Sequence, residues 1–95
     1  MIKVADASPK AVKVTFVVSV DECDQPLSVV GDFNEWDPFE TPLRKRSNGT
    51  RSAAIELERG ASHRFKYLAD GGRWFCDSTI DVAGEGDGAN SVLSV

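Results

Sequence analysis

The chain has 95 residues, a formal net charge of −4 and 41% hydrophobic residues. This length fits one small domain with a single core. The negative charge argues against nucleic acid or an anionic membrane as a partner, because both bind a net positive protein face. No stretch approaches the roughly 20 apolar residues of a membrane-spanning helix. Residues 1–6 lack the features of a signal peptide, so the expected location is the cytoplasm.

The first part of the chain contains two predicted strands. Residues 1–10 are expected to form a lead-in, and residues 11–95 to form one β-sandwich domain. Apolar and polar side chains alternate over 12–20, where β-branched residues are frequent, which predicts a strand. Residues 27–30 form a second apolar run, and a loop that contains Trp36 follows it.

The rest of the chain repeats short apolar runs separated by turn-forming residues. The Asn48-Gly49 pair favours a type I′ hairpin turn, and Asp70-Gly71-Gly72 favours a second tight hairpin. No helical period persists over about eleven residues. Five further strands are predicted, at 43–46, 53–58, 63–69, 73–77 and 90–95, with a loop at 78–89. About seven strands at this spacing predict an all-β fold, an antiparallel β-sandwich of immunoglobulin-like type.

The cysteine and histidine residues give no pattern of a metal or cofactor site. Cys23 and Cys76 lie far apart and lack metal-ligand spacing. In a reducing compartment we expect free thiols, while the sequence alone leaves a disulfide open. His63 has no second His or Cys near it and is expected to be structural. We therefore predict neither a metal ion nor a cofactor.

Two tryptophans occupy unusual positions. Trp36 lies among Asp, Asn and Pro residues that form turns, so a shaped loop presents its ring. Trp74 follows a tight hairpin, and strand alternation points it outward if Phe75 points inward. An exposed indole face attracts the polarised C–H groups of a sugar ring. The alternative is that both rings cap the ends of the sandwich.

Among the polar side chains, we expect candidate residues for ligand recognition rather than for catalysis. Lys66 faces water beside the Trp74 hairpin, where it either binds a ligand or only aids solubility. Asn90 opens the last strand and either caps a turn or offers its amide to a hydroxylated ligand. Glycoside hydrolysis requires two carboxylates at a fixed separation, one in an apolar pocket. The acidic residues here lie in polar loops of a small domain, so we predict no catalytic residues.

Three segments of the chain carry a recognisable pattern: 30–38, with Gly31-Asp32-Phe33-Asn34-Glu35-Trp36, then 65–74, from Phe65-Lys66-Tyr67 to Trp74, and 90–95, from Asn90 to Val95. In this order they resemble carbohydrate-binding module family 48. That family includes the glycogen-binding domain of AMP-activated protein kinase β subunits and the N-terminal domain of isoamylases and glycogen branching enzymes. The resemblance covers about residues 11–95 and implies an early-set, immunoglobulin-like sandwich.

The resemblance also implies a ligand and the residues that bind it. In the sugar-binding members, two tryptophans stack on α-1,4-linked glucose units, and a lysine and an asparagine bind the hydroxyls. These roles fall on Trp36, Trp74, Lys66 and Asn90. The expected function is a non-catalytic α-glucan-binding module, with glycogen, starch-like oligosaccharides or a cyclic dextrin as ligand. The alternative is a protein-interaction or scaffold domain of the same fold that docks on a carbohydrate-active enzyme.

Overall fold

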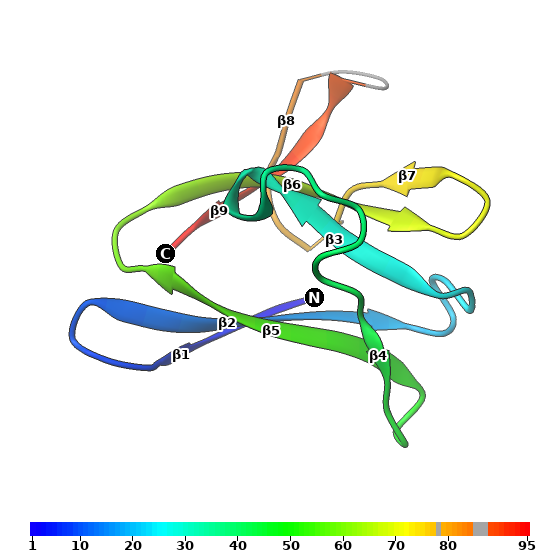
Figure 1. The fold of residues 1–95 in the computed structure, drawn as a ribbon, viewed down its shortest axis with the longest axis horizontal. Helices are drawn as coiled ribbons and strands as arrows, with labels where there is room; N and C mark the ends of the chain where they lie inside the picture. Colours follow the sequence, from blue (N-terminus) through cyan, green and yellow to red (C-terminus); the bar gives the residue numbers. More distant parts are fainter. Residues whose placement is uncertain (78, 85–87) are drawn as a thin grey trace.

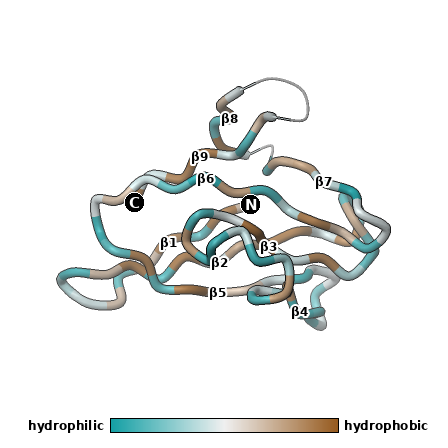
Figure 2. The backbone as a smooth tube through the Cα atoms, turned by 45° about the horizontal axis from the view of Figure 1, so that its top comes forward, coloured by the Kyte–Doolittle hydropathy of each residue, from teal (hydrophilic) through white to brown (hydrophobic). Residues whose placement is uncertain are grey.

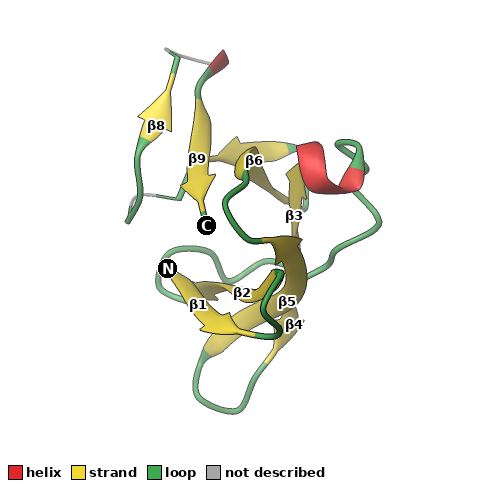
Figure 3. Ribbon diagram, turned by 90° about the vertical axis from the view of Figure 1, so that its left-hand side faces the viewer, coloured by secondary structure: helices red, strands yellow, loops and turns green. Residues whose placement is uncertain are grey.

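The structure is a computed structural model that describes residues 1–77, 79–84 and 88–95. Two antiparallel sheets face each other as a sandwich (Figures 1 and 3), which confirms the predicted immunoglobulin-like all-β fold. The first sheet has the strand order β1-β2-β5-β4, and the second has β3-β6-β9-β8 with β7 paired to β6. The elements are β1 (Ile2–Asp6), β2 (Ala11–Ser19), β3 (Leu27–Gly31), the 3-10 helix η1 (Asp32–Asn34), β4 (Arg44–Lys45), β5 (Thr50–Glu58), β6 (Ser62–Ala69), β7 (Arg73–Phe75), β8 (Val82–Ala83) and β9 (Asn90–Ser94).

The two-residue alternation read from the sequence directs side chains into the core. In β2, Val14, Phe16 and Val18 are fully buried, while the residues between them are partly exposed. Figure 2 shows hydrophobic and hydrophilic residues alternating along the strands. Because successive side chains of a strand point to opposite faces, each sheet has one face against the core and one toward solvent.

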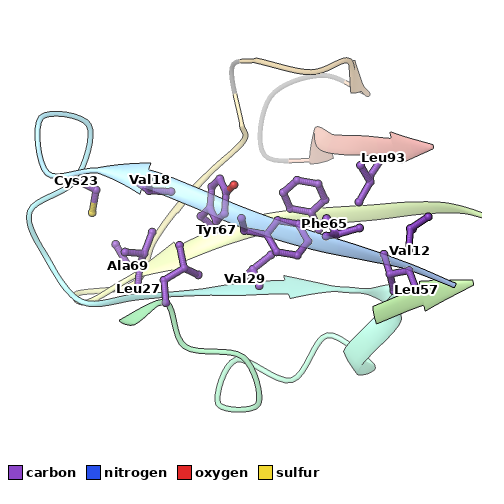
Figure 4. Close-up of a cluster of buried hydrophobic side chains, with 13 residues drawn as sticks. Val12, Val18, Cys23, Leu27, Val29, Leu57, Phe65, Tyr67, Ala69 and Leu93 are labelled. Atoms are coloured by element: carbon purple, nitrogen blue, oxygen red, sulfur yellow. The ribbon is translucent and has the colours of Figure 1, made fainter. Parts of the chain in front are cut away.

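Aromatic rings fill the space between the sheets (Figure 4). The ring of Phe65 lies edge-on to Phe16 at 5.0 Å between centroids and edge-on to Tyr67 at 5.6 Å. Edge-to-face pairs of this kind add stability beyond the burial of area. Cys23 and Cys76 are free thiols, as the reducing-compartment argument predicts, so the core holds without a disulfide bond.

Two strands were not expected from the sequence. β1 lies within residues 1–10, where the sequence predicts a lead-in, and pairs with β2 from Ile2 opposite Phe16 to Asp6 opposite Val12. Four of its five residues are exposed, so backbone pairing holds it and burial leaves little pattern to read. β8 lies within the predicted loop and is only two residues long. Among the described residues, no helix has the length and apolar character to cross a bilayer.

The hairpin between β4 and β5 has a different turn from the one predicted. Arg46 N donates to Thr50 O at 2.7 Å, which leaves residues 47–49 as the loop. Gly49 has φ +78° whereas Asn48 does not have a positive φ. A type I′ turn needs positive φ at both central residues. The hairpin is therefore correct and the type I′ prediction is wrong.

The segment after the Trp36 loop passes from one sheet to the other. Thr41 O accepts from Val29 N at 3.0 Å, and Leu43 N donates to Leu27 O at 2.9 Å, so this segment first runs along β3. It then pairs with β5 through Arg44 and Lys45. The Trp36 loop is thus anchored at both ends, because β3 leads into it and its exit returns to β3.

Candidate functional site

Three of the predicted site residues lie on the outer face of the second sheet. Phe65, Tyr67 and Ala69 of β6 are buried in the core, so Lys66 between them points to the outer face. Leu68 has the same orientation and lies directly opposite Trp74 of β7. Trp74 is 48% exposed and therefore faces solvent, as predicted.

Asn90 joins this region through the register of β6 and β9. Phe65 lies opposite Ser91 at the last pair of the ladder, and Asn90, the next residue of β9, pairs with Ala83 of β8. β3 occupies one side of β6, and both β7 and β9 pair along its other side. Lys66 and Asn90 are half-buried there. The fold therefore places Lys66 and Trp74 on the outer face of β6 and β7, and Asn90 at the start of β9, just beyond the end of the ladder with β6.

The Trp36 loop begins at the neighbouring end of β3, one residue beyond Val30, which lies opposite Lys66. Its internal support is the buried side chain of Asn34. The Oδ1 atom of Asn34 accepts from Gly31 N at 3.0 Å. Its Nδ2 donates to Val29 O at 3.0 Å and to Thr41 Oγ1 at 3.1 Å. The amide of Asn34, which lies within the loop, therefore binds both the strand end where the loop starts and the residue where it exits.

The backbone at Trp36 is in an unusual conformation. Glu35 and Trp36 both have φ +58°, in the left-handed region. A bulky residue rarely adopts this region, and such conformations concentrate at functional sites. The hydrogen bond from Trp36 N to Gly31 O, at 2.8 Å, helps to hold it. The side chain remains 41% exposed, so the loop presents a large part of the indole to solvent.

Asp32 and Gly31 attach the loop to β6. Asp32 Oδ1 lies 2.7 Å from His63 Nδ1, and Oδ2 accepts from Arg64 N at 3.1 Å. A Cβ atom at Gly31 would lie 2.7 Å from Arg64 O, so only glycine allows this approach. Phe33 stacks on Phe16 with 5.6 Å between ring centroids. His63 thus has the structural role that its isolation in the sequence predicts.

A buried polar cluster connects the segment after β7 with β9, and sequence reasoning did not identify it. Asp77 Oδ2 accepts from Tyr67 Oη at 2.7 Å and lies 3.0 Å from the nitrogen of Met1. Asp77 N donates to Ser91 Oγ at 2.7 Å, and Thr79 also bonds the carboxylate. Asp77 lies shortly after Trp74 in the chain, and Ser91 directly follows Asn90. The hydrogen bond between Asp77 and Ser91 therefore ties the segment that carries Trp74 to the start of β9.

Hydrogen bonds and burial determine which of Asp77 and Tyr67 in this cluster is charged. Burial raises the pKa of Asp77, but hydrogen bonds from Thr79 and Tyr67 outweigh it, so the pKa lies below its usual 3.8. Burial, followed by the bond to Asp77, raises the pKa of Tyr67 above its usual range. The pair is therefore a neutral phenol that donates to a carboxylate. An acidic residue after a strand is an ordinary turn signal, and only the tertiary structure reveals its burial.

The described residues offer recognition groups in this region: two indole faces, a lysine and an amide. Within 1–77, 79–84 and 88–95, no three His, Cys, Asp or Glu residues gather as metal ligands do. Residues 85–87, part of the glycine-containing loop before Asn90, lie outside the described structure. Flat aromatic faces with a few polar groups on an open surface can bind a hydroxylated ligand with an apolar side.

No family model matches the chain. It is 38% identical over 50 residues to a 1,4-alpha-glucan branching enzyme of Xanthomonas campestris pv. campestris (strain 8004), a match that covers 52% of this chain and 7% of the enzyme. It is 34% identical over 58 residues to a 1,4-alpha-glucan branching enzyme of Aquifex aeolicus (strain VF5), covering 60% of this chain and 9% of the enzyme. Over more than half of its length, the chain is similar to a small part of these branching enzymes.

Proposed function

We propose that this chain is a non-catalytic α-glucan-binding module. Trp36 and Trp74 act as stacking platforms, and Lys66 and Asn90 hydrogen-bond to sugar hydroxyls. The observation that carries the proposal is the pair of large, partly exposed indoles held by different supports. Trp74 stands on the outer face of the sheet to which Lys66 and Asn90 also belong. Trp36 stands on a constrained loop at the adjoining strand end.

The similarity to branching enzymes supports the choice of ligand, because those enzymes are named for 1,4-α-glucans. Glycogen, starch-like oligosaccharides and cyclic dextrins share that linkage. An open surface covers only part of a sugar, and a flexible chain loses entropy when it is held. We therefore expect a cyclic dextrin, which is already curved, to bind more tightly than a linear oligosaccharide of similar size.

Two of the three acidic residues that flank Trp36 have structural roles, which supports binding without catalysis. Asp32 accepts hydrogen bonds from β6, and Asp37 Oδ1 accepts from Phe39 N at 2.8 Å. Both carboxylates thereby organise the backbone, whereas glycoside hydrolysis needs a pair free to act on the substrate. We place the module in the cytoplasm, and the free thiols agree with a reducing compartment.

The proposal is tested by native electrophoresis through gels that contain glycogen or amylopectin. We expect the wild-type chain to be retarded relative to a glucan-free gel. Trp36→Ala and Trp74→Ala should each remove most of the retardation, because each deletes one stacking platform. Val4→Ala is a matched control, since Val4 is 52% exposed on β1 of the other sheet. Circular dichroism checks that each variant folds.

Unchanged mobility of the wild-type chain on every α-glucan would contradict the proposal. The second candidate, a scaffold domain that docks on a carbohydrate-active enzyme, would then use the same two indoles as interface anchors, since tryptophan is enriched at such anchors. It predicts a stable complex with one protein, and that complex should be lost in both tryptophan variants. Retardation of the wild type that both tryptophan variants lose would contradict a scaffold role alone.

A further inference from the structure

A groove of about 450 Å³ lies on the outer face of the second sheet, next to Trp74. Ser28 of β3 and Leu68 of β6 line it, and Leu68 is directly opposite Trp74. Pro42 and Phe39, from the segment after η1, also line it. The groove therefore adjoins Trp74, one of the two proposed stacking platforms, through Leu68.

The strand register gives the extent of this surface. Pro42 bridges Ser28, Ser28 lies opposite Leu68, and Leu68 lies opposite Trp74. Paired residues of antiparallel strands point to the same face, so these four side chains form one row across the sheet. Three interstrand spacings of about 4.8 Å make the row roughly 14 Å long. The row thus has room for more than one linked sugar ring.

Phe39 is the most exposed large hydrophobic side chain among the described residues, at 87%. Its backbone is fixed, because Phe39 N donates to the side chain of Asp37 at 2.8 Å. An aromatic face can cover the apolar side of a sugar ring. Ser28 and Asp70 add a hydroxyl and a carboxylate to the lining. These groups can bind sugar hydroxyls in a groove whose other walls are largely apolar.

We propose that this groove is a second α-glucan subsite and that Phe39 is its stacking platform. A linear glucan held at Trp74 continues across Leu68 and Ser28 toward Phe39. The inference rests on the proposed function, because it extends the same ligand from the same tryptophan. It makes affinity depend on chain length, and a cyclic dextrin, which closes on itself, does not extend into the groove.

The test compares two ligands on the purified chain by isothermal titration calorimetry, namely a cyclic dextrin and maltoheptaose. We expect Phe39→Ala to weaken maltoheptaose binding about fivefold, the effect of losing one aromatic contact, and to change cyclic dextrin binding less than twofold. Because Phe39 is almost fully exposed, its truncation leaves the fold intact. Phe39→Trp should retain tight maltoheptaose binding, and Val4→Ala serves as the control.

The outcomes separate this inference from the proposed function. If the wild-type chain binds neither ligand, the proposed function fails and the inference fails with it. If the wild type binds both and Phe39→Ala matches it on both, the module binds glucan but the second subsite is overturned. Equal weakening for both ligands also overturns it, because Phe39 then belongs to the first subsite.

Discussion

The backbone of Trp36 has a conformation that presents the ring to solvent at a cost in the stability of the fold. In the left-handed region the Cβ atom of an ordinary residue crowds the following carbonyl oxygen, which costs about 1–2 kcal/mol. Trp36 and Glu35 both carry this cost, with φ +58°. The hydrogen bonds of Asn34 hold the loop in this shape. Strained residues of this kind concentrate at functional sites, which agrees with the proposed role of the Trp36 ring.

This strain predicts that at position 36 the glycine variant is more stable than the alanine variant, the reverse of the usual order. Trp36→Gly and Trp36→Ala both remove the indole, but only alanine keeps a Cβ atom in the left-handed region. We expect the glycine variant to be more stable by about 1 kcal/mol, measured as the free energy of unfolding in urea. Lys13 in β2 is the control position, where glycine should be the less stable variant. Equal stability of the two Trp36 variants would count against backbone strain.

At the scale of elements, the loop from Gly31 to Thr41 folds around the amide of Asn34. Asn34→Ala leaves Gly31 N and Val29 O without their partner in a buried place, at about 1–3 kcal/mol for each group. We expect a clear loss of thermal stability and weaker retardation on glycogen gels, although Asn34 itself is buried. Thr41→Val, which removes one of the three bonds, should have a smaller effect. Normal retardation of a folded Asn34→Ala chain would show that the amide does not position Trp36.

Much of the element order was predictable because burial leaves a two-residue period. The alternation around Phe16 and Phe65 specifies which face of their strands is inward, and an inward Phe75 puts the adjacent Trp74 outward. The edge strand β1 was not predictable in this way, because exposed residues carry no such period. The bonds of Asn34 and the burial of Asp77 depend on residues far apart in the chain. Similar turn-forming residues occur in loops without either feature.

At the scale of the whole molecule, Asp77 couples stability to pH. Its pKa in the folded chain lies below the usual 3.8, so the folded state binds this proton more weakly than the unfolded state. The stabilisation is therefore complete above about pH 5, and it is lost as pH falls through 3.8 toward the folded pKa. This carboxylate connects Tyr67 of β6 with the segment that packs on Ser91.

Replacing Asp77 should change how steeply the free energy of unfolding depends on pH. In Asp77→Asn, the free energy of unfolding should be lower at neutral pH and should fall less steeply below pH 4. The difference in slope is at most about 1.4 kcal/mol per pH unit, the contribution of one proton. Urea titrations from pH 7 to pH 2, with the exposed Asp24→Asn as a control, provide the measurement. Parallel profiles for wild type and Asp77→Asn would contradict the assignment.

The supports of the two tryptophans differ in how much a mutation there would disturb the core. Trp36 is fixed through Asn34 to β3, so a change of its loop disturbs buried hydrogen bonds. Trp74 follows the turn at Gly71 and Gly72, where an added Cβ atom would meet open space, although both residues have positive φ, +87° and +82°. Insertions or deletions in that turn can therefore redirect one indole while leaving the core unchanged. Under the proposed function, a change of length in this turn would alter the angle between the two indoles, and with it the curvature of the glucan that fits both.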